Sequence, residues 1–275
     1  RIENCGNFSV HKTFDCGQAF RFDPDGDDDT FTGTAFGKKI TFSSLGGGVV
    51  ELRGSTAEEY GNTWQRYLSL DSDYDEADRV IIEAMPNERD RAEMSAAVDS
   101  GRGIRILRQD PFETLISFII SQNNNIPRIK KIISALCEKY GENGAFPTAD
   151  ALVEAGEEGI FALKTGFRAG YIYDAAVKVK TGEVVLDDIA KCGDYKKCTD
   201  MLCSIKGVGP KVSSCVLLFG FGKTEAFPID VWMKRSLALH FPDGFDPKPL
   251  GKYAGIAQQY MFYHERWINS ESTKK

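Results

Sequence analysis

Leu202-Cys203-Ser204-Ile205-Lys206-Gly207-Val208-Gly209-Pro210-Lys211-Val212 is the stretch that decides the fold, because it joins two helix-like segments through a glycine-rich turn. Gly207 and Gly209 allow a tight turn and a close approach of the backbone to another surface, and Pro210 fits the first turn of the next helix. The stretch therefore predicts a helix-hairpin-helix. The outward amides of Gly207, Val208 and Gly209 suit a phosphate contact that does not depend on base sequence, although a plain turn between helices stays open.

Lys211 stands where a helix tolerates a cation poorly. The positive end of the helix macrodipole disfavours a charged amine in the first turn, so the neutral form becomes easier to reach there. A neutral lysine is a nucleophile, which is the form that amine catalysis needs. A solvated surface lysine is the ordinary alternative, and position alone does not decide between the two.

A carboxylate, Asp230, stands at the start of the next predicted helix after Lys211. Nineteen positions after Lys211, the sequence Pro228-Ile229-Asp230 precedes another apolar-periodic segment. The side chain of Asp230 can cap that helix, and the cap does not prevent a second role. A helix running out from Lys211, a turn, and a carboxylate at the next helix start would bring the two side chains to one cleft.

The N-terminal region, from Ile2 to about Arg53, has the composition of strands and tight turns. Segments rich in β-branched and aromatic residues alternate there with Asp/Gly and Gly46-Gly47-Gly48 breakers, at residues 20–22, 30–34, 40–42 and 49–52. Beyond Thr56 the apolar period is near 3.6, which indicates helices joined by short loops. We therefore predict an α+β fold, with an antiparallel sheet and flanking helices over residues 1–100, packed on a mainly α-helical region over residues 101–275. A helical body that begins near residue 56 is the alternative.

Start signals place several helices. Asp110-Pro111-Phe112-Glu113 combines an acidic cap with proline at the first helical position, and the helix that it begins is expected to end within residues 122–125. A second helix is expected over residues 126–140, and Pro147-Thr148 starts another. Further helices are predicted at about residues 169–179, 195–202, 211–221, 231–240 and 250–263.

The distribution of charge along the chain bears on which classes of partner it can bind. The 275 residues carry 34 Lys and Arg against 40 Asp and Glu, a net charge of −6, which taken whole argues against a polyanionic partner. Two acidic windows, residues 23–29 and 71–78, hold five carboxylates each, so the rest has 34 basic against 30 acidic residues. Residues 102–140 have seven basic and three acidic residues, a local bias that permits a nucleic-acid face.

The remaining composition excludes other classes of protein. Seven scattered cysteines, an odd number, suit free thiols in a reducing compartment better than a disulfide scaffold. A hydrophobic content of 42% predicts a sizeable core and excludes disorder as the main state. No apolar run approaches the roughly 20 residues that span a bilayer, and the N-terminus has no signal-peptide pattern. We therefore expect no membrane partner.

Several motifs, taken in order, resemble one known family. The block of residues 207–230 resembles the helix-hairpin-helix Gly/Pro-Asp glycosylase superfamily, and Lys211 makes it similar to the bifunctional branch. Other segments follow the order of 8-oxoguanine DNA glycosylases over nearly the whole chain: GQAFR at residues 17–21, QDPF at 109–112, QNNNIPR at 122–128, GFRA at 166–169, YAGIAQ at 253–258, and Phe262. The resemblance implies base excision repair of double-stranded DNA that carries 8-oxoguanine opposite cytosine.

A glycosylase must swing its target nucleotide out of the duplex and hold the partner that is left behind. The resemblance implies that Asn123 fills the vacated space and that Arg128 and Arg168 donate to the estranged cytosine. Phe167 would wedge beside the cytosine and bend the duplex. Without the flanking arginines, Asn123 would be taken for a helix-terminating loop residue and Phe167 for a core aromatic.

For the flipped base, the resemblance implies stacking on Phe262, a contact of Gln258 with the Watson-Crick edge, and packing of Cys215 against the opposite face. The carbonyl of Gly17 would accept a hydrogen bond from N7 of 8-oxoguanine, where guanine offers an acceptor instead of a donor. Leaving a buried polar group unpaired costs about 1 to 3 kcal/mol, so this contact alone cannot explain the discrimination against guanine and the flipping equilibrium must add to it. The ordinary alternatives are a core Phe262, an exposed Gln258 and a small buried Cys215.

The resemblance assigns the chemistry to Lys211 and Asp230. Lys211 would attack C1′ and form a Schiff base that permits strand cleavage by β-elimination, while Asp230 stabilises the cationic sugar. This lysine chemistry needs no metal and no organic cofactor. No iron-sulfur cluster is expected, because the cysteines lack the tight cluster of four after the motif that iron-sulfur relatives carry. A structural cation on the hairpin carbonyls of Cys203, Ile205 and Val208 is a further option that the resemblance offers. We expect a monomer, in the cytoplasm with the nucleoid of a prokaryote or in the nucleus of a eukaryote.

Two positions depart from the family pattern. Trp232 lies where animal members usually have a histidine that contacts phosphate, and Phe167 replaces a common tyrosine. Two other functions stay open. A helix-hairpin-helix glycosylase for alkylated bases shares the fold and the aspartate but does not need the lysine, and in a non-catalytic DNA-binding module Lys211 would only contact phosphate. The lysine and the Asn/Arg set favour the enzyme for oxidised purines.

Overall fold

The computed structural model describes the backbone of residues 1–272 and the side chains of residues 1–266. The predicted sheet is confirmed: four antiparallel strands lie in the order β1-β2-β3-β4, namely β1 (Phe22–Asp25), β2 (Asp27–Ala35), β3 (Lys38–Gly46) and β4 (Val49–Arg53). Phe31 of β2 pairs with Phe42 of β3, which pairs with Leu52 of β4. Since side chains alternate along a strand, this register gathers aromatic rings on one face of the sheet.

The first hairpin differs from the sequence prediction. Residues 20–22 are predicted as a strand and residues 23–29 as a breaker, but β1 begins at Phe22 and the acidic window forms the hairpin itself. Gly26 turns the chain with a φ of 90°, and all five carboxylates of the window are exposed. Aspartate is depleted in strands, yet at a solvated hairpin tip its carboxylate stays hydrated, so cross-strand pairing prevails over composition.

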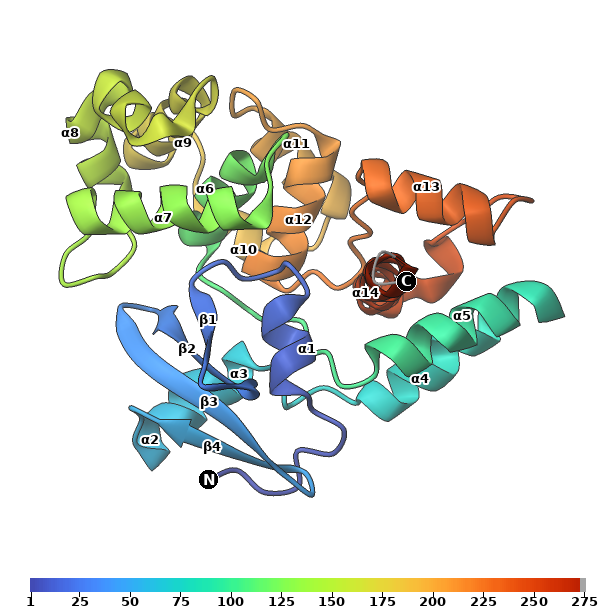
Figure 1. Ribbon diagram of the computed structural model, residues 1–275. Coiled ribbons are helices and arrows are strands. Elements are labelled where there is room, and N and C mark those ends of the chain that lie inside the picture. The colour runs from blue at the N-terminus through green and yellow to red at the C-terminus, as the bar shows by residue number, and fades with distance from the viewer. Residues whose placement is uncertain (273–275) are drawn as a thin grey trace.

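Helix α1 (Val10–Asp15) lies in the region predicted to hold only strands and turns. Ser9 caps it by accepting a hydrogen bond from the amide of Lys12 at 3.2 Å, and Val10 and Phe14 are buried at helical spacing. The ring of Phe14 stacks on Phe42 with a centroid distance of 5.1 Å. Helix α1 therefore covers the aromatic face of the sheet, and in Figure 1 it lies between the sheet and the C-terminal helix.

The rest of the described chain is helical, as predicted. Its elements are α2 (Ala57–Glu59), the π-helix η1 (Tyr60–Trp64), α3 (Gln65–Tyr67), α4 (Tyr74–Glu83), α5 (Glu88–Gly101), α6 (Pro111–Ser121), α7 (Ile126–Tyr140), α8 (Ala149–Ile160), the π-helix η2 (Phe161–Thr165), α9 (Arg168–Thr181), α10 (Leu186–Lys191), α11 (Tyr195–Cys203), α12 (Pro210–Phe221), α13 (Val231–His240), the 3₁₀-helix η3 (Lys248–Tyr253) and α14 (Ala254–Ser272). No described helix combines the length and the apolarity that crossing a membrane requires.

The start signals of α6 and α8 are confirmed, since Asp110 and Thr148 cap these helices through their side chains. The last helix differs from the prediction, which has it begin at residue 250. A 3₁₀ turn precedes it instead, because Gly251 has a φ of 52° that an α-helix cannot hold. The α-helix therefore begins at Ala254.

Two hydrophobic cores hold the described residues together. The smaller core joins the sheet, α1, Trp64 and Tyr67, and the larger one joins the helices. Ile81 of α4 and Met94 of α5 belong to the larger core, so these helices pack with the helical body although they precede residue 101. Figure 1 shows this arrangement, with α4 and α5 beside α14 and the sheet on the other side of α1. The boundary between residues 100 and 101 stays a prediction.

The helix-hairpin-helix is confirmed. Helices α11 and α12 flank a turn in which Gly209 is the N-terminal cap residue of α12 and Pro210 is its first residue. Gly207 has a φ of 79°, and a Cβ atom built on it would lie 2.3 Å from a ring carbon of Tyr171. Both the backbone conformation and the close packing require glycine at this position.

We expect Gly207→Ala to destabilise the protein by at least about 2 kcal/mol, because it adds left-handed strain to an overpacked contact. Urea unfolding followed by circular dichroism measures this change. Gly209→Ala is the matched control: its φ is −105° and no atom lies within 4 Å of the added carbon, so the cost should stay below about 1 kcal/mol. Equal losses for the two variants would contradict the argument from packing.

Candidate active site

A cavity of about 410 Å³ lies where α6, α12, α13 and α14 meet the loop that follows α1. Its wall contains Lys211, Asp230, Gly17 and Phe262, four residues that the sequence analysis selects from distant parts of the chain. In Figure 1, α12 lies beside α6, and α14 is seen end-on beside α13. The structure thus brings the predicted nucleophile, the predicted carboxylate and two predicted base contacts to one open cavity.

Lys211 reaches this cavity from the first turn of α12. Its side chain is partly buried, and Nζ lies 5.4 Å from the ring centroid of Phe118 on α6. Phe118 in turn stacks on Phe219, with 5.4 Å between the ring centroids. The amine therefore has an aromatic floor, which is far from the environment of a solvated surface lysine.

Asp230 fills both roles that the sequence analysis considers. It is the N-terminal cap residue of α13, and its Oδ1 accepts a hydrogen bond from the amide of Met233 at 2.7 Å. The same carboxylate lies on the cavity wall with Lys211. The capping hydrogen bond restricts the side chain of Asp230, so the carboxylate is held at the start of the helix beside the cavity.

Cys215 and Gln258 are buried, and neither lines the cavity. Burial raises the pKa of the Cys215 thiol; the nearby charge of Lys211 opposes this shift and that of Asp230 adds to it. The thiol therefore lies beside both predicted catalytic residues. Gln258 is 6% exposed, and its Oε1 has no hydrogen-bond partner in the described part of the chain. A buried acceptor without a partner is suited to a ligand that brings a donor.

Gly17 faces the aromatic side of the cavity. Its φ is 79°, and a Cβ atom there would lie 3.8 Å from Cε1 of Phe262 and 3.8 Å from Cδ1 of Ile126. The backbone of Gly17 therefore lies close to the ring of Phe262. The contacts of both residues with a flipped base stay a prediction.

A second cluster of predicted residues lies where the α6–α7 loop meets the start of α9. Asn123 is exposed and has a left-handed φ of 48°. Arg128 is exposed as well, and its Nη2 donates to the carbonyl of Lys164 at 3.4 Å. Phe167 precedes α9 with 56% of its surface exposed, so it is not a core aromatic.

Arg168 is only 2% exposed, and its guanidinium holds the loop of Asn123. Nε donates to the carbonyl of Gln122 at 2.8 Å, Nη2 to those of Asn123 at 2.8 Å and Gln122, and Nη1 to that of Thr165 at 3.2 Å. Burial lowers the pKa of Arg168, and the charge of Arg128 lowers it further, so the two guanidinium groups lie near each other. A contact of Arg168 with cytosine would have to exchange some of these bonds, and that role stays a prediction.

The hairpin offers two free amides. The amide of Val208 donates to the carbonyl of Ile205 at 3.0 Å, whereas those of Gly207 and Gly209 have no partner among the described residues. Phosphate binding by the two glycine amides stays a prediction, and for Val208 it would require a shared hydrogen. The described residues contain no group of three or more His, Cys, Asp or Glu side chains that could hold a metal ion. A cation on the hairpin carbonyls stays a prediction, with the carbonyl of Ile205 already accepting one hydrogen bond.

Trp232 extends the cavity wall beyond Asp230. The indole is 55% exposed, and the guanidinium of Arg235 lies 5.8 Å from its ring centroid. It adds a flat and partly exposed aromatic surface to the lining of the cavity. In the sequence, Trp232 stands out only as a departure from the family pattern. The sequence also does not reveal that Phe20 and Phe118 line the cavity, because their positions depend on how distant segments pack.

A buried ion pair joins the first strand region to α6. Nη1 of Arg21 lies 3.2 Å from Oε2 of Glu113, and the side chains are 10% and 15% exposed. Burial raises the pKa of Glu113 to about 7, which the charge of Arg21 opposes and that of Asp110 adds to. Phe20, the neighbour of Arg21, lines the cavity, so this pair supports one wall of the site.

The pair predicts a dependence of stability on pH. Because the folded pKa of Glu113 is raised from 4.5 to about 7, its contribution to stability is fully present below pH 4.5 and is lost as the pH rises through 7. We expect Glu113→Gln to flatten this part of the profile of Tm against pH, measured by calorimetry. Glu138→Gln, at an exposed position on α7, serves as the control and should leave the profile unchanged. A profile that Glu113→Gln does not alter would contradict the assignment.

The two halves of the chain match two family models. Residues 2–115 match the N-terminal domain of 8-oxoguanine DNA glycosylase, and residues 116–249 match the HhH-GPD superfamily of base excision DNA repair proteins. The fold and the hairpin are therefore those of a helix-hairpin-helix base excision repair protein.

Solved structures that are similar to nearly the whole chain identify the family within this superfamily. The 8-oxoguanine glycosylase/lyase of Clostridium acetobutylicum, in complex with double-stranded DNA containing cytosine opposite 8-oxoguanine, is 37% identical with a TM-score of 0.86, over 96% of this chain and 93% of that one. MBOgg1 in complex with a low-affinity DNA ligand is 34% identical with a TM-score of 0.88, over 98% and 95% of the two chains. The chain belongs to the 8-oxoguanine DNA glycosylase family.

A curated relative is longer than the part that matches. The N-glycosylase/DNA lyase of Saccharomyces cerevisiae is 39% identical over 155 residues, which are 50% of this chain and 41% of the yeast protein. The chain thus matches less than half the length of that relative.

Proposed function

We propose that this chain, acting as a monomer, excises 8-oxoguanine opposite cytosine from double-stranded DNA and then nicks the strand. The observation that carries the proposal is the single cavity wall shared by Lys211, Asp230, Gly17 and Phe262. It supplies an amine, a carboxylate, a backbone edge and a stacking ring around one space that is large enough for a purine. The similar structure of the Clostridium acetobutylicum enzyme, bound to double-stranded DNA with cytosine opposite 8-oxoguanine, supports the same substrate.

The chemistry follows from the two polar residues on this wall. The nitrogen of Lys211 bonds to C1′ as the bond from C1′ to the base breaks, and the carboxylate of Asp230 stabilises the positive charge on the sugar. Loss of a proton from the nitrogen and opening of the sugar ring convert the aminal into a Schiff base. The Schiff base acidifies C2′, and removal of a C2′ proton expels the 3′ phosphate.

Two other functions fit the residues less well. A DNA clamp would need Lys211 on a surface that faces phosphate, whereas its amine lies over Phe118 at the cavity. A glycosylase for alkylated bases would use Asp230 but would give Lys211 no task. The lysine in the cavity is therefore the feature that separates the proposal from both alternatives.

Borohydride reduction tests the Schiff base directly. The protein is mixed with a duplex that contains 8-oxoguanine opposite cytosine, reduced, and separated on a denaturing gel. We expect a covalent complex of protein and DNA whose formation requires the lesion. A protein that binds the duplex but forms no covalent complex would exclude the lyase mechanism.

Arg128→Ala tests recognition of the estranged base. Loss of a forked donor set should relax discrimination between cytosine and adenine opposite the lesion by about tenfold. Single-turnover excision rates on the two duplexes give the ratio. Lys131→Ala removes an exposed positive charge from the same helix and should lower binding to both duplexes alike. An unchanged ratio in Arg128→Ala would remove this arginine from the recognition of cytosine.

A further inference from the structure

The turn that carries Gly17 is held on both sides by glutamine amides. Nε2 of Gln259, on α14, donates to the carbonyl of Cys16 at 2.7 Å. Nε2 of Gln109, before α6, donates to the carbonyl of Gln18 at 2.8 Å. Of these three consecutive carbonyls, the middle one, that of Gly17, accepts no hydrogen bond from any residue in the described part of the chain.

The side chain of Gln18 secures the same turn from within. It is 1% exposed; its Nε2 donates to the carbonyls of Arg105 at 2.8 Å and Thr13 at 2.9 Å, and its Oε1 accepts from the amide of Leu107 at 2.9 Å. A buried amide with these partners cannot rotate without losing several hydrogen bonds. The free carbonyl of Gly17 is therefore a fixed acceptor.

One face of α14 provides both the anchor and the stacking ring. Gln259, Phe262 and Arg266 are three and then four residues apart, so they lie on one side of the helix. Gln259 is 3% exposed and bonds to Cys16, Phe262 lines the cavity, and the guanidinium of Arg266 lies 3.4 Å from the carboxylate of Asp15. The helix thus sets the position of the Gly17 turn relative to the ring of Phe262.

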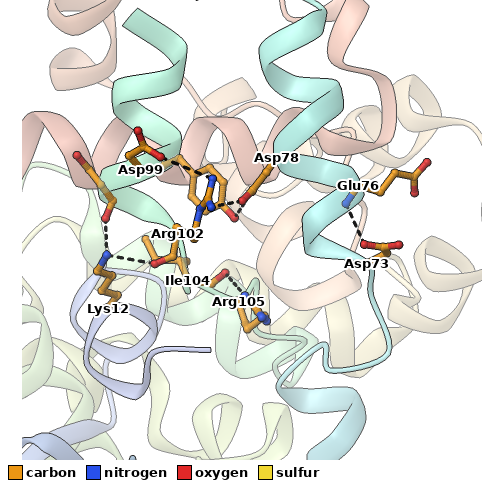
Figure 2. Close-up of polar contacts among 10 residues, drawn as sticks. Lys12, Asp73, Glu76, Asp78, Asp99, Arg102, Ile104 and Arg105 are labelled. Atoms are coloured by element: carbon orange, nitrogen blue, oxygen red, sulfur yellow. Dashed lines mark hydrogen bonds and ion pairs between the residues drawn. The ribbon is translucent and has the colours of Figure 1, made fainter. Parts of the chain in front are cut away.

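Helix α1, which leads into the turn, is anchored at another point. Nζ of Lys12 donates to the carbonyls of Ser100 at 2.7 Å and Arg102 at 3.1 Å, as Figure 2 shows for Lys12 and Arg102. Arg102 itself pairs with Asp78 of α4, with 3.3 Å between Nε and Oδ2. Since both ends of the segment are fixed, little backbone freedom is left for the turn between them.

We propose that Gln259 is a positioning residue for lesion specificity, which holds the Gly17 carbonyl where it meets the hydrogen on N7 of 8-oxoguanine. The inference rests on the proposed function. Gln259 does not touch the base. It acts through the carbonyl of Cys16, and Gln109 acts in the same way through the carbonyl of Gln18. A hydrogen bond weakens steeply when its acceptor moves out of line. The position of the Gly17 carbonyl therefore determines how strongly it binds the hydrogen on N7.

A substrate analogue isolates this single contact. Two duplexes carry 8-oxoguanine or an analogue with carbon in place of N7, each opposite cytosine, and Kd is measured in the Lys211→Gln background so that no turnover occurs. The reference protein should prefer 8-oxoguanine over the analogue by about tenfold, the effect of one hydrogen bond in a buried site. Gln259→Leu should reduce this preference to about twofold or less, because the anchored turn relaxes.

A neighbouring residue on the same helix supplies the control. Tyr260→Phe removes one buried hydrogen bond, from the tyrosine hydroxyl to Oδ1 of Asp78 at 3.0 Å, on the side of α14 that faces α4. A general loosening of α14 would lower the affinity for both duplexes equally, in this variant and in Gln259→Leu. The proposal requires that Tyr260→Phe keep the tenfold preference and that Gln259→Leu lose it.

Gln109→Leu provides a second variant that does not alter α14. It removes the other anchor, and it should also lower the preference for 8-oxoguanine over the analogue. A preference that stays at the reference value in Gln259→Leu would overturn the inference, whatever Gln109→Leu shows. A reference protein without any preference for 8-oxoguanine over guanine would instead overturn the proposed function, so the two failures are distinguishable.

Discussion

Lys211→Gln is expected to abolish the covalent complex formed under borohydride and to lower base release by at least about 10³-fold, because no other amine lines the cavity among the described lysines. The fold should persist. Glutamine removes a cation from the positive end of α12, which offsets the lost contact with the ring of Phe118. Single-turnover excision and the denaturing gel measure the two effects, and thermal unfolding confirms that the variant is folded.

Lys206→Gln is the matched control for this experiment. Lys206 lies in the same hairpin, five residues earlier, and its side chain is exposed. The variant loses the same charge but no amine from the cavity, so weaker binding with an intact covalent complex is expected. If Lys211→Gln still forms the complex, the nucleophile is another group and the central assignment is wrong.

Asp230→Asn is expected to separate the two roles of this carboxylate. Asparagine is as good a helix cap as aspartate, so the bond to the amide of Met233 should survive and stability should change by less than about 0.5 kcal/mol. The negative charge beside the sugar is lost, and base release should fall by about 10² to 10³-fold. Urea unfolding and single-turnover excision, carried out on the same preparation, give both numbers.

Asp194→Asn shows what the loss of a capping charge does elsewhere. Asp194 caps α11 by accepting from the amide of Lys197 at 3.0 Å, and it is exposed and away from the cavity. The stability and the excision rate of the Asp194→Asn variant should both remain near those of the unmodified protein. A comparable loss of excision rate in the two variants would mean that the effect of Asp230→Asn comes from helix ends in general.

Local signals were sufficient for much of the fold and for the centre of the site. A glycine-proline turn, a capping aspartate and a 3.6-residue period act over a few residues, so they predict α11, α12 and the cap of α13 from sequence alone. The resemblance adds Gly17 and Phe262, which the structure places on one cavity wall with Lys211 and Asp230. The boundaries of α12 and α13 agree with the prediction to within one residue.

The features that the sequence does not reveal depend on packing between distant segments. Phe118 looks like any residue of a buried stripe, and only the meeting of α6 with α12 places its ring under an amine. Gln259 looks like a polar residue on a helix, because its partner, the carbonyl of Cys16, lies 243 positions away. The acidic hairpin and α1 differ from the prediction for another reason. Composition averages over several residues, whereas the strand register decides the hairpin and the single cap of Ser9 decides the start of α1.

The loop of Asn123 has a consequence for how DNA would be searched. Asn123 has a left-handed backbone, and the guanidinium of Arg168 donates to its carbonyl, which holds the loop in one conformation. A finger that is rigid beforehand spends no conformational entropy on entering a duplex. The cost of insertion would then be mainly the free energy of opening the base pair. Damaged sites would be distinguished by how easily their base pairs open.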